Sequence, residues 1–253
     1  MPHDAATPDK PRPSWRDGLP PPPPGPAPES HFAGSQTVRD IVIGVADGLT
    51  VPFALAAGLA GTVASNPLIV TAGLAVIAAG CVAKGMGGLL AARTEIAHYA
   101  AERRREAQEI HDWPDRERWE VLVILHRQGL RDDILTGATD AICADPDTWV
   151  DFMMRFELEM TEPESGLAQR SAMAMGGAYV AGGLIPLLPY MLFSGTRPAL
   201  ILSAVLTAVA LTGFGWLKAR ATGLPPGPGA AQALGVGVAA AALAFVVAGV
   251  ASR

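Results

Sequence analysis

The sequence contains few of the residues on which several common protein classes depend. Only two cysteines occur among 253 residues, and Cys81 and Cys143 share no CxxC spacing, so neither a disulfide framework nor a zinc site is indicated. Charged residues make up 17% of the chain, aromatic residues 6%, and the formal net charge is -5. Because no large uncompensated basic face remains, nucleic acid is not an expected partner.

Signatures of catalysis are also lacking. The sequence shows no Ser/His/Asp or Cys/His set and no glycine-rich phosphate loop, and His98, His111 and His126 have no paired spacing with carboxylates that makes a strong site. We therefore do not expect an enzyme, and we expect no prosthetic group.

Long apolar runs dominate what remains. Half of the residues are hydrophobic, the mean hydropathy is +0.29, and five runs each approach the roughly 20 residues that a helix needs to cross a bilayer. We predict an all-α membrane protein with five transmembrane helices, two within residues 36–92 and three within 169–253. The runs extend over about Val38–Gly61, Pro67–Ala92, Ala172–Phe193, Pro198–Leu217 and Ala230–Ala251.

Residues 93–168 form a polar insert between the second and third runs, with helical periodicity throughout. The second run continues without a breaker to about Ile110, so we expect one long helix that projects from the membrane and stops at Asp112–Pro114. Three shorter helices are expected after it, over about 115–129, 130–144 and 147–160. The first of these has an expected apolar stripe of Trp119, Leu122, Val123 and His126.

The distribution of Lys and Arg predicts how the chain crosses the membrane. Basic residues precede the first run and fill the insert, which places the amino terminus and the insert in the cytoplasm by the positive-inside rule. Residues 1–35 are rich in proline and lack an apolar targeting segment, so we expect a disordered arm. We predict a multi-pass protein of the bacterial inner membrane.

Carboxylates and thioethers recur at helical spacing in the insert. Glu106 with Glu109, Glu117 with Glu120, and Met154 with Glu157 are i,i+3 pairs, each on one helix face. Hard oxygen and soft sulfur ligands together suit Fe(II) or Mn(II) better than Ca(II) or Mg(II). The alternative is an ordinary salt-bridged surface with core methionines. The candidate metal ligands are Glu106, Glu109, Glu117, Glu120, Met153, Met154 and Glu157.

Two motifs resemble the vacuolar iron transporter family. Residues 39–53, RDIVIGVADGLTVPF, resemble its opening signature, and Asp145-Pro146 with WVDFMM at 149–154 resembles the end of its cytosolic metal-binding domain. The resemblance implies a homodimer of five-span protomers, with a pore between subunits and proton-coupled export of Fe(II), often with Mn(II), from the cytosol. Zn(II) is a further ion expected to bind the domain. All seven candidate ligands match the family's metal-binding positions, and Asp47 matches its pore carboxylate.

The chain departs from the family pattern in the second run. Where the family usually has Ser-Met-Gly-x-Gly-Glu-Tyr, residues 83–89 are AKGMGGL, so Lys84 replaces a methionine and Gly88 a glutamate. Lys84 and Asp47 lie at similar depths from the cytoplasmic side, which predicts an ion pair; otherwise Lys84 extends to the membrane surface. Two alternatives to a metal exporter therefore remain open, a membrane-anchored metal-binding or sensing protein with an impaired pore and a transporter of a non-metal solute.

Small residues in the first two runs suit close helix contacts in lipid. The family resemblance places the dimer axis beside such helices, so we expect them to contribute to a homodimer. The residues concerned are Gly44, Gly48, Ala56, Gly58, Gly80 and Gly85.

Overall fold

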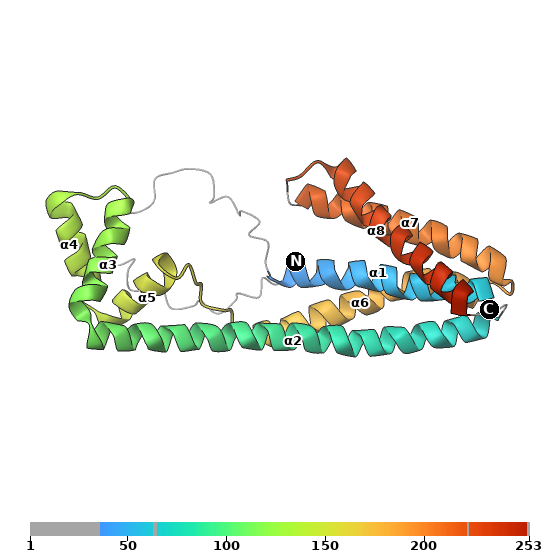
Figure 1. The fold of residues 1–253 in the computed structure, drawn as a ribbon, viewed down its shortest axis with the longest axis horizontal. Helices are drawn as coiled ribbons and strands as arrows, with labels where there is room; N and C mark the ends of the chain where they lie inside the picture. The colour runs from blue at the N-terminus through green and yellow to red at the C-terminus, as the bar shows by residue number, and fades with distance from the viewer. Residues whose placement is uncertain (1–35, 63–64, 222, 252–253) are drawn as a thin grey trace, which may run out of the picture. The chain divides into compact units, whose positions relative to one another are not determined.

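The computed structural model describes residues 36–62, 65–221 and 223–251, and every regular element within these ranges is an α-helix (Figure 1). The predicted disordered arm, residues 1–35, lies outside the described residues. The helices are α1 (Gln36–Thr62), α2 (Asn66–Asp112), α3 (Pro114–Arg127), α4 (Asp132–Cys143), α5 (Pro146–Phe156), α6 (Leu167–Leu192), α7 (Thr196–Ala221) and α8 (Pro226–Ala251).

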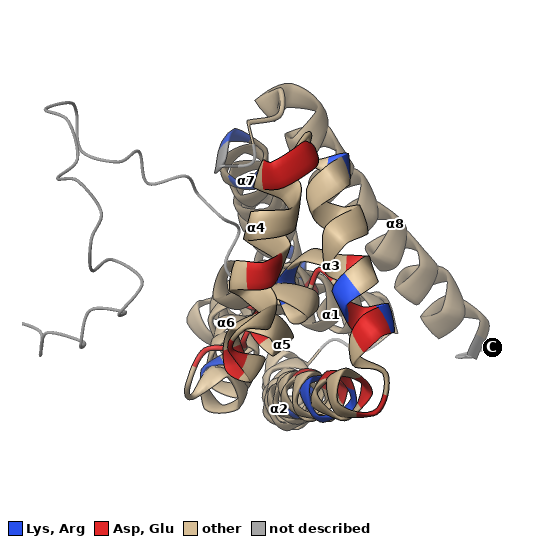
Figure 2. Ribbon diagram, turned by 90° about the vertical axis from the view of Figure 1, so that its left-hand side faces the viewer, with Lys and Arg blue, Asp and Glu red and all other residues tan. Residues whose placement is uncertain are grey.

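Five of these helices, α1, α2, α6, α7 and α8, are long and apolar enough to cross a membrane. They coincide with the five predicted runs, so the predicted fold class is confirmed and the chain is a multi-pass membrane protein. Figure 2 shows that acidic and basic residues gather on α2 to α5, whereas α8 carries none. The division of the chain into separate cytosolic and membrane domains stays a prediction.

Helix α2 is 47 residues long and continuous from its apolar half into the insert, as predicted (Figure 1). It ends at Asp112 because Pro114 disfavours helical backbone at Trp113, whose φ is -135° and ψ 52°. Pro114 then occupies the first turn of α3, where its missing N–H is not needed. This proline therefore sets the corner at which the chain turns back on α2.

Close contacts through glycine hold α6 against both α1 and α2. A Cβ on Gly48 would lie 2.4 Å from the carbonyl oxygen of Tyr179, and a Cβ on Gly88 would lie 2.9 Å from that of Ser171. Such contacts need residues without side chains, since small residues let helix backbones approach in lipid. A side chain at position 88 would therefore meet the backbone of α6 at Ser171 in this arrangement of the two helices.

The small residues expected at a dimer contact pack within the chain instead. Gly44, Gly48 and Gly85 face the backbone of α6, Gly58 faces Ala244 of α8, and Gly80 faces the ring of Tyr179. Ala56 is fully buried in an apolar cluster with Leu187 and Ala199. These residues therefore give no support to a dimer, which is left to rest on the family resemblance.

The insert has its own apolar core, formed where α3 and α5 pack on α2. The expected inward stripe of α3 is wrong at both of its ends, because Trp119 is 61% exposed and His126 is also exposed. The buried residues of this helix are Glu117 and Val121. Helix α5 ends at Phe156, four residues before its predicted end. At its start the Asp145 carboxylate accepts a hydrogen bond from the Thr148 N–H, 2.9 Å away. The core consists of Ile110, Val121, Trp149, Val150, Met153 and Met154.

Candidate metal centre

Three carboxylates from three parts of the insert converge. Glu106 comes from the polar half of α2, Glu117 from the first turns of α3, and Glu157 caps the end of α5. One oxygen of each lies within 4.8 Å of the others. The corner at Trp113 folds α3 back on α2, so the structure brings together one glutamate from each of the three predicted pairs.

Two of these glutamates are buried. Glu106 is 2% exposed and Glu117 is 4% exposed, and the Oε2 atom of each lacks a hydrogen-bond partner. A buried polar atom without a partner costs about 1–3 kcal/mol, and more when it carries charge. The two carboxylates are therefore stabilised only if they take up a proton or a cation.

The pKa values of the three carboxyl groups reflect the same cost of burying ionised carboxylates close together. Burial, followed by repulsion from Glu109 and Glu117, raises the pKa of Glu106 to about 7. Burial and then the neighbouring carboxylates raise the pKa of Glu117 and of Glu157 to about 7 as well. A divalent cation would compensate both burial and the repulsion between carboxylates, because it supplies positive charge and ligand contacts to the ionised forms.

A polar cavity of about 330 Å³ opens beside Glu117 and Glu157, while Glu106 is not among its lining residues. It has room for an ion with some of its water, because one water takes about 30 Å³ of liquid volume. The indole of Trp113 lines it, a residue that ligand chemistry in the sequence could not have identified. The lining residues are Glu109, Trp113, Arg116, Glu117, Glu120 and Glu157.

Arginines neutralise the outer carboxylates, so the alternative of a salt-bridged surface holds for that part. The Nη2 atom of Arg105 lies 2.7 Å from Glu102, its Nε atom lies 3.7 Å from Glu109, and Arg116 lies 3.2 Å from Glu120. Arg105 also approaches Glu106, at 3.7 Å. Glu102, one helical turn before Glu106, was not among the predicted ligands, and it is not part of the carboxylate cluster.

Met153 and Met154 lie in the apolar core of the insert, 0% and 1% exposed. Neither lines the carboxylate cavity. Met154 borders a different cavity, with Tyr99 and Asp151 among its neighbours. The predicted role of the two methionines as soft ligands stays a prediction, and their observed contacts are those of core residues.

The ion pair predicted between the first two spans is present. The ammonium of Lys84 on α2 contacts the carboxylate of Asp47 on α1, and the two side chains are 37% and 38% exposed. The pair is thus neither sealed in the helix bundle nor fully open to its surroundings.

A family model described as the VIT family matches residues 38–249. The chain belongs to the VIT family. Vacuolar iron transporter 1 of Arabidopsis thaliana is 48% identical over 198 residues, which cover 78% of this chain and 79% of that protein. Vacuolar iron transporter 1 of Oryza sativa subsp. japonica is 47% identical over 199 residues, 79% of each chain. Protein CCC1 of Saccharomyces cerevisiae is 34% identical over 188 residues, 73% of this chain and 58% of that protein.

The family assignment confirms the resemblance inferred from residues 39–53. The range matched by the VIT family model contains both the Asp47–Lys84 pair and the whole carboxylate cluster. Both places therefore lie within the VIT family region and not in an added segment.

Proposed function

We propose that this chain transports Fe(II) across a membrane, with Mn(II) as a second substrate. The observation that carries the proposal is the convergence of Glu106, Glu117 and Glu157, two of them buried with unpartnered oxygens, on the extension of a membrane-spanning helix. A cluster of this kind at the end of a span is suited to collect a cation before it enters the membrane.

The choice of iron rests on the relatives and not on the cluster. Three carboxylates would accept many hard or borderline divalent ions, and the methionines that favour softer metals lie in the core. The relatives named as vacuolar iron transporters, at 47% and 48% identity, support iron.

We also propose export from the cytosol in exchange for protons, which the distribution of charges supports. The insert is rich in Arg, which favours the cytoplasmic side, and carboxylates must lose their protons to bind a metal. We further propose a homodimer, on the family resemblance alone. A bacterial inner membrane stays a prediction, and the two plant relatives are named as vacuolar.

The Asp47–Lys84 pair favours a second candidate function. An ammonium that contacts the carboxylate of the transport path would repel a divalent cation, so the chain could bind metal in the insert without conducting it. The chain would then be a membrane-anchored metal-binding or sensing protein.

Metal flux into proteoliposomes distinguishes the two candidates. The full chain is reconstituted, and Fe(II) or Mn(II) uptake is followed with an internal dye, with and without a pH gradient. Metal flux that rises when the side of the membrane opposite the metal is more acidic supports the transporter. Metal binding by calorimetry without any flux supports the anchored protein. Both candidates are refuted if the chain shows no flux and no binding.

A further inference from the structure

Two carboxylates lie on the membrane-spanning helices, and both belong to α1. They are Asp40 and Asp47, since α6, α7, α8 and α2 as far as Ala92 carry no Asp or Glu. Asp47 contacts the ammonium of Lys84, whereas the structure shows no ion pair at Asp40 within its described residues. Of the two carboxylates, Asp40 is therefore the one whose charge is not balanced in this way.

Asp40 is buried at the contact between α1 and α6. Its exposed fraction is 2%, and its Oδ2 atom accepts a hydrogen bond from the hydroxyl of Ser171, which is also 2% exposed. An ionised carboxylate that lacks a cation is costly to bury, above all within a membrane. Uptake of a proton removes this cost, because the neutral acid carries no charge.

Ser171 is a suitable partner for a carboxyl group that changes its protonation state. A hydroxyl both donates and accepts hydrogen bonds, so it can donate to the carboxylate and accept from the carboxylic acid. Asp40 lies in the second turn of α1 and Ser171 in the second turn of α6. The hydrogen bond between the two helices can therefore be kept whether the proton is bound or lost.

The position of Asp40 relates it to the ion pair of the spans. Asp40 and Asp47 are seven residues apart, two turns of α1, so they share one side of the helix at roughly 10 Å from each other, at about 1.5 Å per residue. On α2, Gly88 follows Lys84 by one turn, and a Cβ on Gly88 would lie 2.9 Å from the carbonyl oxygen of Ser171. The contact between Asp40 and Ser171 therefore lies one layer beyond the ion pair, on the side toward the insert.

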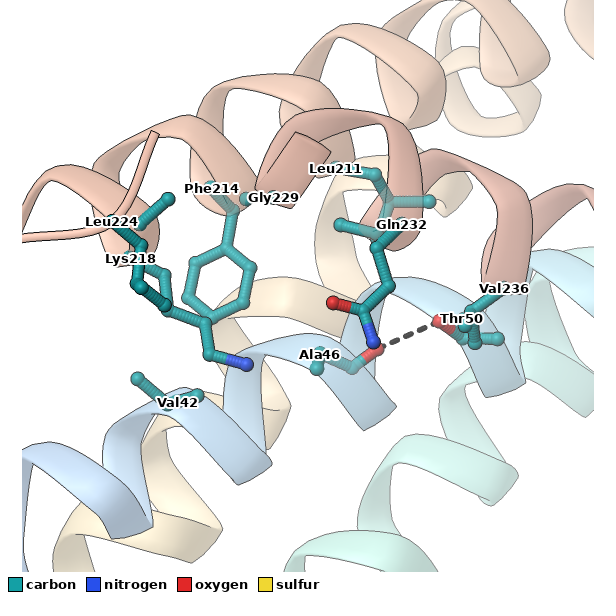
Figure 3. Close-up of a pocket in the computed structure, with 13 residues that line it drawn as sticks. Val42, Ala46, Thr50, Leu211, Phe214, Lys218, Leu224, Gly229, Gln232 and Val236 are labelled. Carbon is teal, nitrogen blue, oxygen red and sulfur yellow. Dashed lines mark hydrogen bonds between the residues drawn. The ribbon is translucent and has the colours of Figure 1, made fainter. Parts of the chain in front are cut away.

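Basic residues occur on the helices around Asp40, but none forms an ion pair with it in the described part of the chain. Arg39 precedes it on α1 and is exposed, as is Arg93 of α2. Arg170 of α6 pairs with a glutamate of the insert. From α7, the amine of Lys218 extends toward α1 at a separate cavity (Figure 3), and α8 carries no charged residue. On the side of α1 that faces α6, the next charged group is thus the ion pair.

We propose that Asp40 holds the proton that is exchanged for the transported cation, with Ser171 as its fixed hydrogen-bond partner. This inference rests on the proposed function of a proton-coupled exporter. One O–H bond forms at the carboxylate when a proton arrives, and the same bond breaks when the proton leaves to water. A cation that displaces the ammonium of Lys84 adds positive charge to the next layer. This charge favours loss of the proton, because like charges repel strongly in a medium of low dielectric.

Infrared spectroscopy of the full chain in lipid tests proton binding without any transport. Spectra of wild type and Asp40→Asn are recorded without metal between about pH 4 and pH 9, and their difference isolates the carboxylic-acid C=O band of position 40. Asparagine has the same shape and can still accept the hydrogen bond from Ser171, so the contact between α1 and α6 is kept. We expect the band in wild type and its loss in Asp40→Asn. Glu95→Gln, which removes an exposed carboxylate of α2, is the control and should retain the band.

Ser171→Ala tests the partner through a different property of the same band. Loss of the hydroxyl should move the C=O band of Asp40 to a higher frequency, because a carboxyl group that loses a hydrogen bond has a stiffer C=O bond. A residue that only fastens α1 to α6 would not change this frequency. Thermal unfolding establishes that each variant is folded.

Proteoliposomes test the coupling to transport. Mn(II) uptake and the internal pH are followed with two dyes. Wild type should move protons in the direction opposite to Mn(II), and Asp40→Asn should lose this proton movement while its insert still binds Mn(II). Glu95→Gln should behave as wild type.

The two measurements separate a failure of this inference from a failure of the proposed function. Absence of flux in wild type, with the band of position 40 present, would refute export and confirm the proton site. Absence of the band in wild type at every pH would overturn the inference, as would undiminished proton movement in folded Asp40→Asn. An unshifted band in Ser171→Ala would refute the pairing of Asp40 with Ser171.

Discussion

Lys84 and Asp47 join α2 to α1 by an ion pair within the membrane-spanning region. Each charge offsets the cost of holding the other in an apolar setting. The pair also gives Asp47 a cation that belongs to the protein itself. If transport uses the Asp47 carboxylate, as we propose, an incoming metal ion must first displace the ammonium.

Replacing Lys84 with methionine should accelerate metal transport. One unit-charge pair at about 4 Å is worth roughly 4 kcal/mol at an effective dielectric near 20, and a divalent ion feels about twice that before screening. Relief of even part of this repulsion should raise Fe(II) uptake into liposomes by about tenfold or more. If Lys84→Met is no faster and wild type already transports rapidly, the ammonium lies away from the path.

Replacing Asp47 with alanine should harm both stability and transport, because Lys84 is left without its partner. Since both side chains are partly exposed, we expect a loss of about 1–2 kcal/mol, less than for a sealed pair. The double variant Asp47→Ala/Lys84→Met should regain stability but not flux. Thermal unfolding and dye-reported uptake measure the two effects, and recovery of flux in the double variant would remove Asp47 from the transport path.

Joint replacement of Glu106 and Glu117 by glutamine should abolish tight metal binding by the insert. Their buried, unpartnered oxygens are the ones with most to gain from a cation. Calorimetry of the full chain with Mn(II) or Zn(II) measures the change. Glu164→Gln is the control, because Glu164 lies in the insert but pairs with Arg170 at 2.8 Å. Undiminished binding in the double variant would return these residues to a structural role.

Without metal, the protein should lose stability as pH rises. The pKa values of Glu106, Glu117 and Glu157 are about 7 in the folded chain and near 4.5 unfolded, so the folded state holds more protons between these values. The contribution is fully present below about 4.5 and is lost as pH rises through about 7. Asp145, whose pKa is lowered by its hydrogen bonds with Thr148, titrates below this window.

The size of this effect is limited by the cavity, which admits water, and by coupling among the carboxylates. One pKa unit is worth about 1.4 kcal/mol, and we expect a total near 2 kcal/mol between pH 5 and pH 8. Thermal unfolding at the two pH values measures it. Mn(II) should restore stability at pH 8 and have little effect at pH 5, and an unchanged profile in Glu106→Gln/Glu117→Gln would contradict this assignment.

Two adjacent glycines of α2 should respond differently to alanine. A Cβ at Gly88 would meet the Ser171 backbone at 2.9 Å, whereas a Cβ at Gly87 has nothing within 4 Å. We expect Gly88→Ala to destabilise by about 1–3 kcal/mol through overpacking. Gly87→Ala should be neutral or stabilising by up to about 1 kcal/mol. Thermal unfolding of both variants in the same lipid measures the two changes in stability. Similar changes for Gly87→Ala and Gly88→Ala would refute the close packing of α2 on α6.

Sequence patterns predicted the elements better than their facing surfaces. Run lengths located five spans, and the absence of a breaker before Trp113 located the long α2. Trp119 was expected inside because it forms an apolar stripe at helical spacing with Leu122, Val123 and His126, but α3 turns Glu117 and Val121 inward to meet α2 and α5. Which face of a short helix is buried depends on partners distant in sequence, and local periodicity cannot supply that information.

For the candidate site, the sequence predicted the residue types and their spacing but not which side chains are buried. Helical spacing identified the glutamates, but not that Glu106 and Glu117 are sealed while Glu109 and Glu120 face arginines. Burial arises from the corner at Trp113 and from the end of α5, so a pattern within one helix could not distinguish the inner from the outer member of each pair.

Glu106 of the carboxylate cluster and Lys84 both belong to the unbroken helix α2. Glu106 and Lys84 are 22 residue steps apart, roughly 33 Å along the axis at about 1.5 Å per residue. A cation that drew the carboxylates of α3 and α5 toward Glu106 would therefore act on the same helix that carries Lys84, whose ammonium contacts Asp47. Between these two residues α2 packs closely on α6, because a Cβ on Gly85 would lie 3.3 Å from the carbonyl oxygen of Ala172 and a Cβ on Gly88 would lie 2.9 Å from that of Ser171, so a movement of α2 here would also have to move α6.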